Sequence, residues 1–154
     1  GIYAPNDNQK KFYKRLYDKI ISVGEENICL IGDFNASVDI KKDYVSTEQI
    51  RKKKKRTLPK TFFDLTKETN LEDIWQMRNP NEKKFTFYSS PQKSWSRIDM
   101  VWVNGAIEKD NSEIEIMPNI WADHSLMKIT CRGQNKRKRR WILNSQITKV
   151  KEYI

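Results

Sequence analysis

The sequence is short of the residues that build disulfide frameworks and metal centres. Its 154 residues include two cysteines, Cys29 and Cys131, and a single histidine, His124. A structural zinc site uses four cysteine or histidine ligands, so these three residues are too few for one. Both cysteines lie in apolar, strand-like stretches, which predicts two buried thiols in a reducing compartment.

Long apolar runs are also missing. No run approaches the roughly 20 residues that a membrane-spanning helix needs, and no signal-peptide pattern is visible. Hydrophobic residues make up 37% of the chain and charged residues 32%. This composition and length predict one rather polar, water-soluble domain with a core of its own.

Basic residues are in clear excess. Lysine and arginine number 30 against 20 acidic residues, which gives a formal net charge of +10. Such a surplus favours polyanionic partners, nucleic acid first and an anionic membrane second. The densest run, residues 51–56, predicts a mobile surface loop because its like charges repel one another. It has three interpretations: a solvated loop, a localisation signal, or an arm that contacts phosphates.

The stretch from Ile28 to Asn35 is the organising feature of the chain. Four consecutive apolar residues predict a strand that is buried on both faces. Gly32 ends the run, where a chain can turn or approach a ligand closely. Asp33 and Asn35 are two residues apart, so in extended backbone they point the same way at a strand end. The alternative is an ordinary strand exit in which both residues close a turn.

The pattern of the remaining residues predicts an α/β domain. Ile2 to Ala4 reads as a strand, and apolar residues at helical spacing predict a helix that begins after Asp7 or Asn8 and ends near Gly24. Two short helices and four strands are expected later, at 58–65, 71–75, 85–88, 98–103, 113–116 and 126–131. We place a domain boundary at residue 132, which leaves 133–154 as a basic tail.

Ionisable side chains lie at two further strand ends. Asp99 opens a core strand, and Asp123 precedes His124 just before another strand. Together with Asp33 they predict a converging site. Carboxylates hold hard cations, and an Asp–His pair supplies a base with its orienting partner, so the set suits metal-assisted hydrolysis of a phosphate ester. Alternatively, His124 is an ordinary surface or packing residue.

Five motifs, in order, resemble the endonuclease domain of LINE-type (non-LTR) retrotransposons, within the exonuclease–endonuclease–phosphatase superfamily. They are Ile2-Tyr3-Ala4-Pro5-Asn6, Gly32-Asp33-Phe34-Asn35, Phe85-Thr86-Phe87-Tyr88-Ser89, Ser96-Arg97-Ile98-Asp99 and Ala122-Asp123-His124-Ser125. The resemblance implies a two-sheet, four-layer α/β sandwich of the endonuclease/exonuclease/phosphatase type. It also implies a Mg²⁺-dependent enzyme (with Mn²⁺ as a substitute) that nicks duplex DNA for target-primed retrotransposition, in the nucleus and cytoplasm. Neither a membrane partner nor a small-molecule cofactor is expected.

The resemblance also assigns catalytic roles. Tyr3 would line the scissile phosphate, and Asn35 would hold one of its oxygens. Asp33 would orient the attacking water or protonate the leaving oxygen. Asp99 would orient the imidazole of His124, which would contact the phosphate or act as a base.

The remaining roles concern substrate and metal. Asn6, Thr86 and Arg97 would contact the substrate, and Asp123 would hold the magnesium ion. The family places a serine where this chain has Ala122, so that hydroxyl is lost.

Two expectations concern the whole parent protein. The family's main metal-binding glutamate and an asparagine precede the Tyr3 motif, so we expect an N-terminally truncated domain whose activity is lost or impaired. Trp141 to Asn144 resembles the linker to a reverse transcriptase, which implies a longer polyprotein; the alternative is a basic tail with a short amphipathic helix. Two other functions stay open: a phosphatase or phosphodiesterase acting on lipid or inositol phosphates, and a non-catalytic nucleic-acid-binding remnant.

Overall fold

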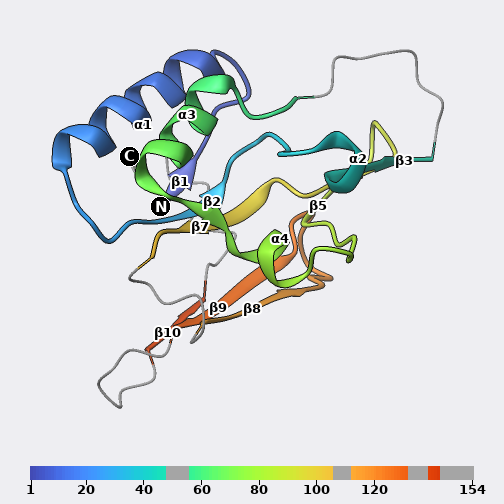
Figure 1. The fold of residues 1–154 in the computed structure, drawn as a ribbon. Helices are drawn as coiled ribbons and strands as arrows, with labels where there is room; N and C mark the ends of the chain where they lie inside the picture. The colour runs from blue at the N-terminus through green and yellow to red at the C-terminus, as the bar shows by residue number, and fades with distance from the viewer. Residues whose placement is uncertain (48–55, 106–111, 132–138, 143–154) are drawn as a thin grey trace.

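The computed structural model describes residues 1–47, 56–105, 112–131 and 139–142, and the fold is α/β (Figure 1). The helices are α1 (Gln9–Val23), α2 (Ile40–Asp43), α3 (Lys60–Thr69) and α4 (Ile74–Arg78). The strands are β1 (Ile2–Tyr3), β2 (Cys29–Asp33), β3 (Tyr44–Ser46), β4 (Glu72–Asp73), β5 (Phe87–Ser89), β6 (Ser94–Ser96), β7 (Asp99–Val103), β8 (Ser112–Met117), β9 (Leu126–Cys131) and β10 (Arg139–Ile142). The predicted basic loop at 51–56 lies outside the described residues except for Arg56.

The central sheet has the strand order β1-β2-β7-β4. β1 pairs with β2 in parallel and α1 connects them, so the predicted strand–helix–strand unit is present. β7 lies antiparallel between β2 and β4. Helix α1 begins after Asn8 and ends at Gly24, whose positive φ lets its N–H return to the carbonyl of Ile20.

Strand β7 is buried on both faces and joins two hydrophobic cores. Met100 and Trp102 face the helices α1 and α3, where the ring of Phe62 lies 5.1 Å from that of Trp102. Val101 and Val103 face the opposite way, as alternation along a strand requires. The strand is apolar at consecutive positions because each of its two faces packs into a different core.

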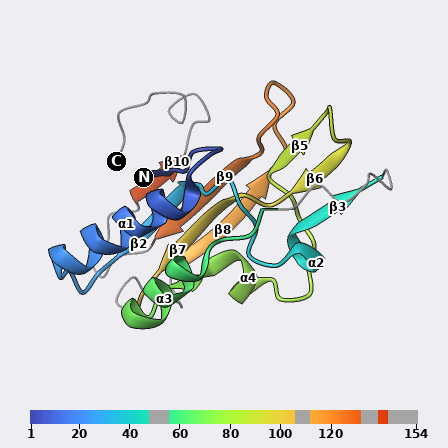
Figure 2. The ribbon, with the colours of Figure 1, turned by 90° about the horizontal axis from the view of Figure 1, so that it is seen from above.

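The second core lies between the central sheet and the sheet β10-β9-β8. Ile116, Met127 and Ile129 from the second sheet pack against Val101 and Val103. The described residues thus form three layers, with helices α1 and α3, the central sheet and the second sheet in that order (Figures 1 and 2). A helical layer on the outer side of the second sheet is not among them.

Strand β2 differs from its prediction in two respects. Cys29 is exposed rather than buried, because it is the first residue of the strand, at the edge of the core. Gly32 does not end the strand at a turn: it lies inside the strand, opposite Ile2, with φ of 145°. A Cβ there would meet the carbonyl oxygen of Ile2 at 1.9 Å, so the glycine permits β1 to pair closely.

The remaining strands complete the described fold. β3, β6 and β5 form a small antiparallel sheet beside the central one. β10 pairs with β9 although it lies in the segment assigned to the basic tail, and its backbone is extended rather than helical. Among the described helices, none has both the length and the hydrophobicity to cross a bilayer.

Candidate active site

The pairing of β2 with β7 brings two carboxylates together. Asp33 ends β2 and Asp99 begins β7, and the antiparallel register sets them directly opposite each other. Both follow the alternation of Ile31 and Val101, so they project toward the second sheet. The predicted convergence of these strand ends is therefore present, at the point where the two packed sheets end.

His124 reaches the same point from the second sheet. It lies just before β9, and the segment around it is held against β5, because Ser125 N–H donates to the carbonyl of Thr86 at 2.6 Å. Its Nδ1 lies 2.8 Å from Oδ2 of Asp99, and its ring centre lies 4.7 Å from that of Phe87. The predicted Asp99–His124 contact is thus formed, with His124 partly and Asp99 almost fully buried.

Asn35 lies beside Asp33, but because the chain turns there and not because its backbone is extended. Its backbone has φ of 49°, in the left-handed region, and its N–H donates to Oδ1 of Asp33 at 2.8 Å. The two residues therefore form a tight turn after the strand, as the turn alternative predicted. The Asn35 amide then donates to the carbonyl of Ala4 and to Oδ1 of Asn6, so it ties the β1 exit to the β2 exit.

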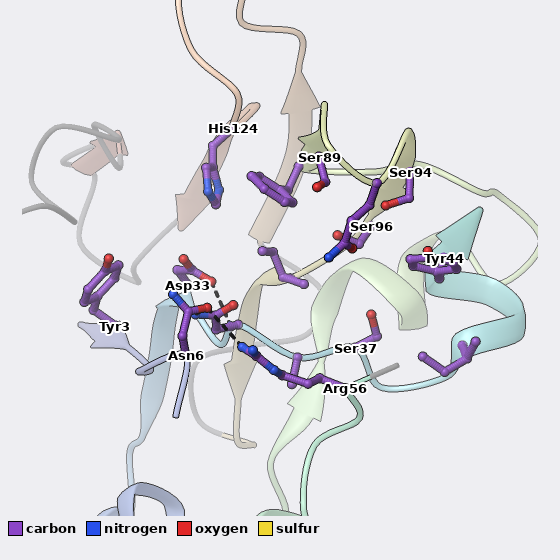
Figure 3. A pocket seen from close by; sticks show the side chains of 16 residues that line it. Tyr3, Asn6, Asp33, Ser37, Tyr44, Arg56, Ser89, Ser94, Ser96 and His124 are labelled. Carbon is purple, nitrogen blue, oxygen red and sulfur yellow. Dashed lines mark hydrogen bonds between the residues drawn. The ribbon is translucent and has the colours of Figure 1, made fainter. Parts of the chain in front are cut away.

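Asp33, Asn35 and His124 line a polar cleft of about 640 Å³, whereas Asp99 is not among its lining residues. In Figure 3 His124 points down toward Asp33, while Tyr3 stands on one side and Arg56 enters from below. Arg56 Nη1 donates to Oδ1 of Asn6 at 3.0 Å. The lining residues are Tyr3, Asn6, Asp33, Asn35, Ala36, Ser37, Ile40, Tyr44, Arg56, Phe87, Ser89, Gln92, Ser94, Ser96, Ile98 and His124.

No protein-family model matches this chain. The geometry and chemistry of the cleft are therefore the structural basis for a proposed function.

Three of the residues could hold a cation. Ligand atoms of Asp33, Asp99 and His124 all lie within 4.8 Å of one another. His124 Nδ1 and Asp99 Oδ2 are engaged with each other, which leaves the second Asp99 oxygen and the Asp33 carboxylate as donors. Mg²⁺ usually takes one or two protein carboxylates and keeps several waters, so this donor set fits Mg²⁺ or Mn²⁺.

Burial and the closely spaced charged groups shift the pKa values of Asp33 and His124. Burial and the neighbouring charge of Asp99 raise the pKa of Asp33 to about 7, although the Asn35 hydrogen bond opposes them. Burial alone would lower the pKa of His124, but its hydrogen bond to Asp99 and the nearby negative charges raise it above the ordinary value. A bound cation would reduce the repulsion between the two carboxylates.

Asp33→Asn should make the cation-free protein more stable at neutral and alkaline pH. Asp33 ionises near pH 3.8 in the unfolded chain but at about 7 in the fold. The folded state therefore keeps a proton that the unfolded state releases, and stability falls as pH rises from about 4 to about 7. Above pH 7 the variant should gain about 2–4 kcal/mol in urea unfolding, with no gain below pH 4. The exposed Asp7→Asn is the control; equal stabilities of Asp33→Asn and wild type at pH 8 would contradict the buried charge.

Two predicted substrate contacts are structural instead. Thr86 is fully buried, and its Oγ1 accepts from the N–H groups of Ile98 and Asp99, both at 3.1 Å. It does not line the cleft; it fixes the start of β7 and so the position of Asp99. Arg97 is also buried, 1% exposed, and does not line the cleft.

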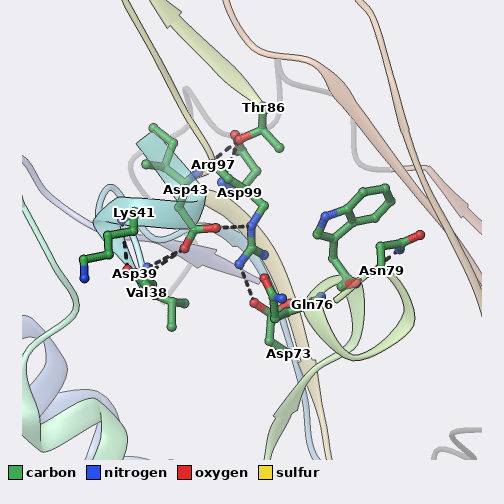
Figure 4. Close-up of polar contacts among 12 residues, drawn as sticks. Val38, Asp39, Lys41, Asp43, Asp73, Gln76, Asn79, Thr86, Arg97 and Asp99 are labelled. Atoms are coloured by element: carbon green, nitrogen blue, oxygen red, sulfur yellow. Dashed lines mark hydrogen bonds and ion pairs between the residues drawn. The ribbon is translucent and has the colours of Figure 1, made fainter. Parts of the chain in front are cut away.

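Arg97 lies between two buried carboxylates (Figure 4). Its Nε donates to Oδ1 of Asp43 at 2.8 Å, and its Nη2 lies 2.7 Å from Oδ2 of Asp73. Asp73 also caps α4, because its Oδ1 accepts from Gln76 N–H, so Arg97 joins α2 to α4. The predicted role in substrate binding is wrong for this side chain, because no part of it reaches the cleft.

Asp123, the predicted metal ligand, lies outside the cluster. It is exposed and does not line the cleft, although its charge is felt by both Asp33 and His124. Its carbonyl oxygen, not its carboxylate, is fixed, by accepting from Tyr88 N–H at 3.1 Å. The cluster is formed by Asp33, Asp99 and His124, all three expected there, and Asp123 is not part of it.

The sequence interpretation missed several residues of the cleft. Arg56 was counted only as the last member of a basic run, and the run was the one signal that pointed to it. Hydroxyl groups line the far end of the cleft, where Ser37 and Tyr44 lie below Ser94 and Ser96 (Figure 3). No spacing in the sequence identifies them, because they come from separate elements.

Proposed function

We propose that the chain carries the Asp–His part of a metal-dependent phosphodiester-hydrolysing site that nicks DNA, as its likeness to LINE-type endonucleases implies. The observation that supports this most is the Asp99–His124 pair, 2.8 Å apart, opposite Asp33 in a polar cleft. Acid–base pairs beside a second carboxylate suit hydrolysis of a phosphate ester better than simple binding. The fold would be the corresponding four-layer sandwich, of which three layers are described.

The residues have distinct roles in this reaction. His124 donates its Nδ1–H to Asp99, which fixes the ring and leaves Nε2 as the acceptor for a proton of the attacking water. The raised pKa of His124 makes it a stronger base, active once the pH exceeds that value. Carboxylate oxygens of Asp33 and Asp99 would hold Mg²⁺, which supplies positive charge against the charge that develops on the phosphate.

Other groups would position the phosphate. Asn6 and Tyr3 present an amide and a hydroxyl group to the cleft, Arg56 adds a guanidinium, and the amide of Asn35 holds Asn6 in place. Guanidinium groups bind phosphate oxygens in pairs. The net charge of +10 supports a nucleic acid as the source of that phosphate rather than a small or lipid headgroup.

Nicking of supercoiled plasmid tests the proposal. Because the resemblance implies lost or impaired activity, we expect nicked circles at a low rate at most in Mg²⁺ or Mn²⁺, and the loss of any nicking with EDTA or with His124→Ala. Release of phosphate from inositol or lipid headgroups at a higher rate would favour the other enzymatic alternative. Nicking that His124→Ala leaves unchanged would show that a contaminating nuclease is responsible.

Binding without cleavage is the second candidate, and one observation favours it. Asp123 is outside the cluster, so two carboxylates remain where the family resemblance implies a larger ligand set. Plasmid that is bound and shifted in a gel but never nicked in Mn²⁺ would decide for this candidate.

Neutralising the basic run should weaken the salt dependence of DNA binding. Replacing Lys52, Lys53, Lys54 and Lys55 with glutamine lowers the net charge from +10 to +6. Each phosphate contact contributes about −0.9 to the slope of log affinity against log salt, so the slope should flatten by about 1–3. The matched control replaces Lys10, Lys11, Arg15 and Lys19 on the exposed face of α1, with the same change of charge. Equal slopes for the two variants would mean that the run makes no special contact.

A further inference from the structure

The loop between β8 and β9, residues 118–125, carries an unusual pair of apolar side chains. Ile120 is 84% exposed and Trp121 is 89% exposed, whereas the other exposed large hydrophobic residues of the described chain reach 59% at most. Trp121 N–H donates to Oδ1 of Asn119 at 3.0 Å, which restrains the backbone at this point of the loop. An indole exposed to water is less favourable than a buried one, so contact with a partner surface would stabilise it.

The loop lies next to the cleft. Trp121 precedes His124 by three residues, so their Cα atoms are at most about 11 Å apart. Residues 123–125 are anchored by backbone hydrogen bonds to Thr86 and to Tyr88 of β5, which fixes the direction of the loop. A distance of about 11 Å corresponds to roughly three stacked base steps along a strand.

The size and charge of the surface formed by Ile120 and Trp121 indicate which kind of partner it can bind. Two side chains are too small for a stable protein interface, which buries more than about 1,000 Å² in total. An indole ring instead matches the face of one nucleobase. The nearest charged side chain along the loop is the acidic Asp123, which disfavours a phosphate at that place and leaves a base face as the contact.

We propose that Trp121 stacks on an unpaired base within a few nucleotides of the phosphate at His124. The protein would then prefer DNA in which a base near the cleavage site is already unpaired, because a fully paired duplex exposes no base face without unstacking. This inference rests on the proposed function only in taking DNA as the partner. It adds a recognition surface that the cleft residues do not supply.

Binding to two matched duplexes tests the inference. The duplexes are identical except that one has a single unpaired thymidine, and affinity is measured by fluorescence anisotropy in EDTA so that no cleavage occurs. We expect the wild type to bind the bulged duplex about tenfold more tightly. Trp121→Ala should reduce this preference to about one, while Trp121→Phe should keep most of it. Val23→Ala, an exposed apolar change at the end of α1, should leave the preference unchanged.

The salt dependence separates stacking from charge. Because the indole is neutral, the slope of log affinity against log salt should be the same in Trp121→Ala and the wild type. A preference that survives in Trp121→Ala, or a wild type without preference, would overturn the inference while leaving DNA nicking as the function. Absence of DNA binding by the wild type would overturn both. Loss of a wild-type dimer in Trp121→Ala, seen by sedimentation, would overturn the inference by making a second copy the partner.

Discussion

Asp99→Asn should lower the rate of DNA nicking by about 10²- to 10⁴-fold, and His124→Ala should lower it by a similar factor. Asparagine keeps the shape of the side chain but lacks the charge that holds Nδ1–H toward it, 2.8 Å away. The imidazole would then lose its fixed orientation and its basicity. The rates of both variants are measured on supercoiled plasmid in Mn²⁺.

The two losses should be strongly non-additive. Because Asp99 orients His124, the double variant should lose less activity than the product of the two single losses, and any loss beyond that of His124→Ala measures the role of Asp99 as a cation ligand. Additive losses would show that each residue acts independently, for example with Asp99 as a metal ligand alone. Asp64→Asn, on α3 and away from the cleft, is the control for general effects of removing a carboxylate.

A readout without catalysis is available for the same pair. His124 is the single histidine of the chain, so its imidazole proton signals need no further assignment in an NMR titration. The wild type should titrate above 6.5, because Asp99 outweighs the effect of burial. In Asp99→Asn the effect of burial is less opposed, and the pKa of His124 should fall below its wild-type value. A pKa that does not move would mean that the hydrogen bond contributes nothing to the charged imidazole.

The part of the site that the sequence could predict rests on long-range regularities. Consecutive apolar residues made β2 and β7 recognisable, and polar groups at strand ends meet at a sheet edge whatever the details of the loops. That is why Asp33, Asp99 and His124 come together as expected. The register Asp33–Asp99 follows once both strands are placed antiparallel with their polar ends together.

The rest could not be predicted, because it depends on which side of a strand or turn becomes buried. Arg97 and Asp99 are two apart in one motif, yet Arg97 lies in a buried ion cluster and Asp99 lies in the cluster with Asp33 and His124. Thr86 carries a hydroxyl that two buried N–H groups require, so it is not free for substrate. Asp123 and His124 are adjacent, and only one of two adjacent side chains can face the cleft from extended backbone.

Arg97→Met should destabilise the protein by about 3–5 kcal/mol in urea unfolding. The change removes the guanidinium from between Asp43 and Asp73, which are 3% and 8% exposed. Two carboxylates would then be left buried near each other without a compensating charge. The loss should grow as pH rises, because ionised carboxylates are what the guanidinium compensates.

Further variants distinguish a buried ion cluster from a substrate contact. Arg97→Lys should lose an intermediate amount, because an ammonium cannot span two carboxylates as a planar fork does. Replacing Asp43 and Asp73 with asparagine in the Arg97→Met background should recover part of the loss, since no uncompensated charge remains. The exposed Arg78→Gln should stay within about 0.5 kcal/mol of the wild type. Weaker DNA binding by Arg97→Met with unchanged stability would reverse this assignment and return Arg97 to the substrate.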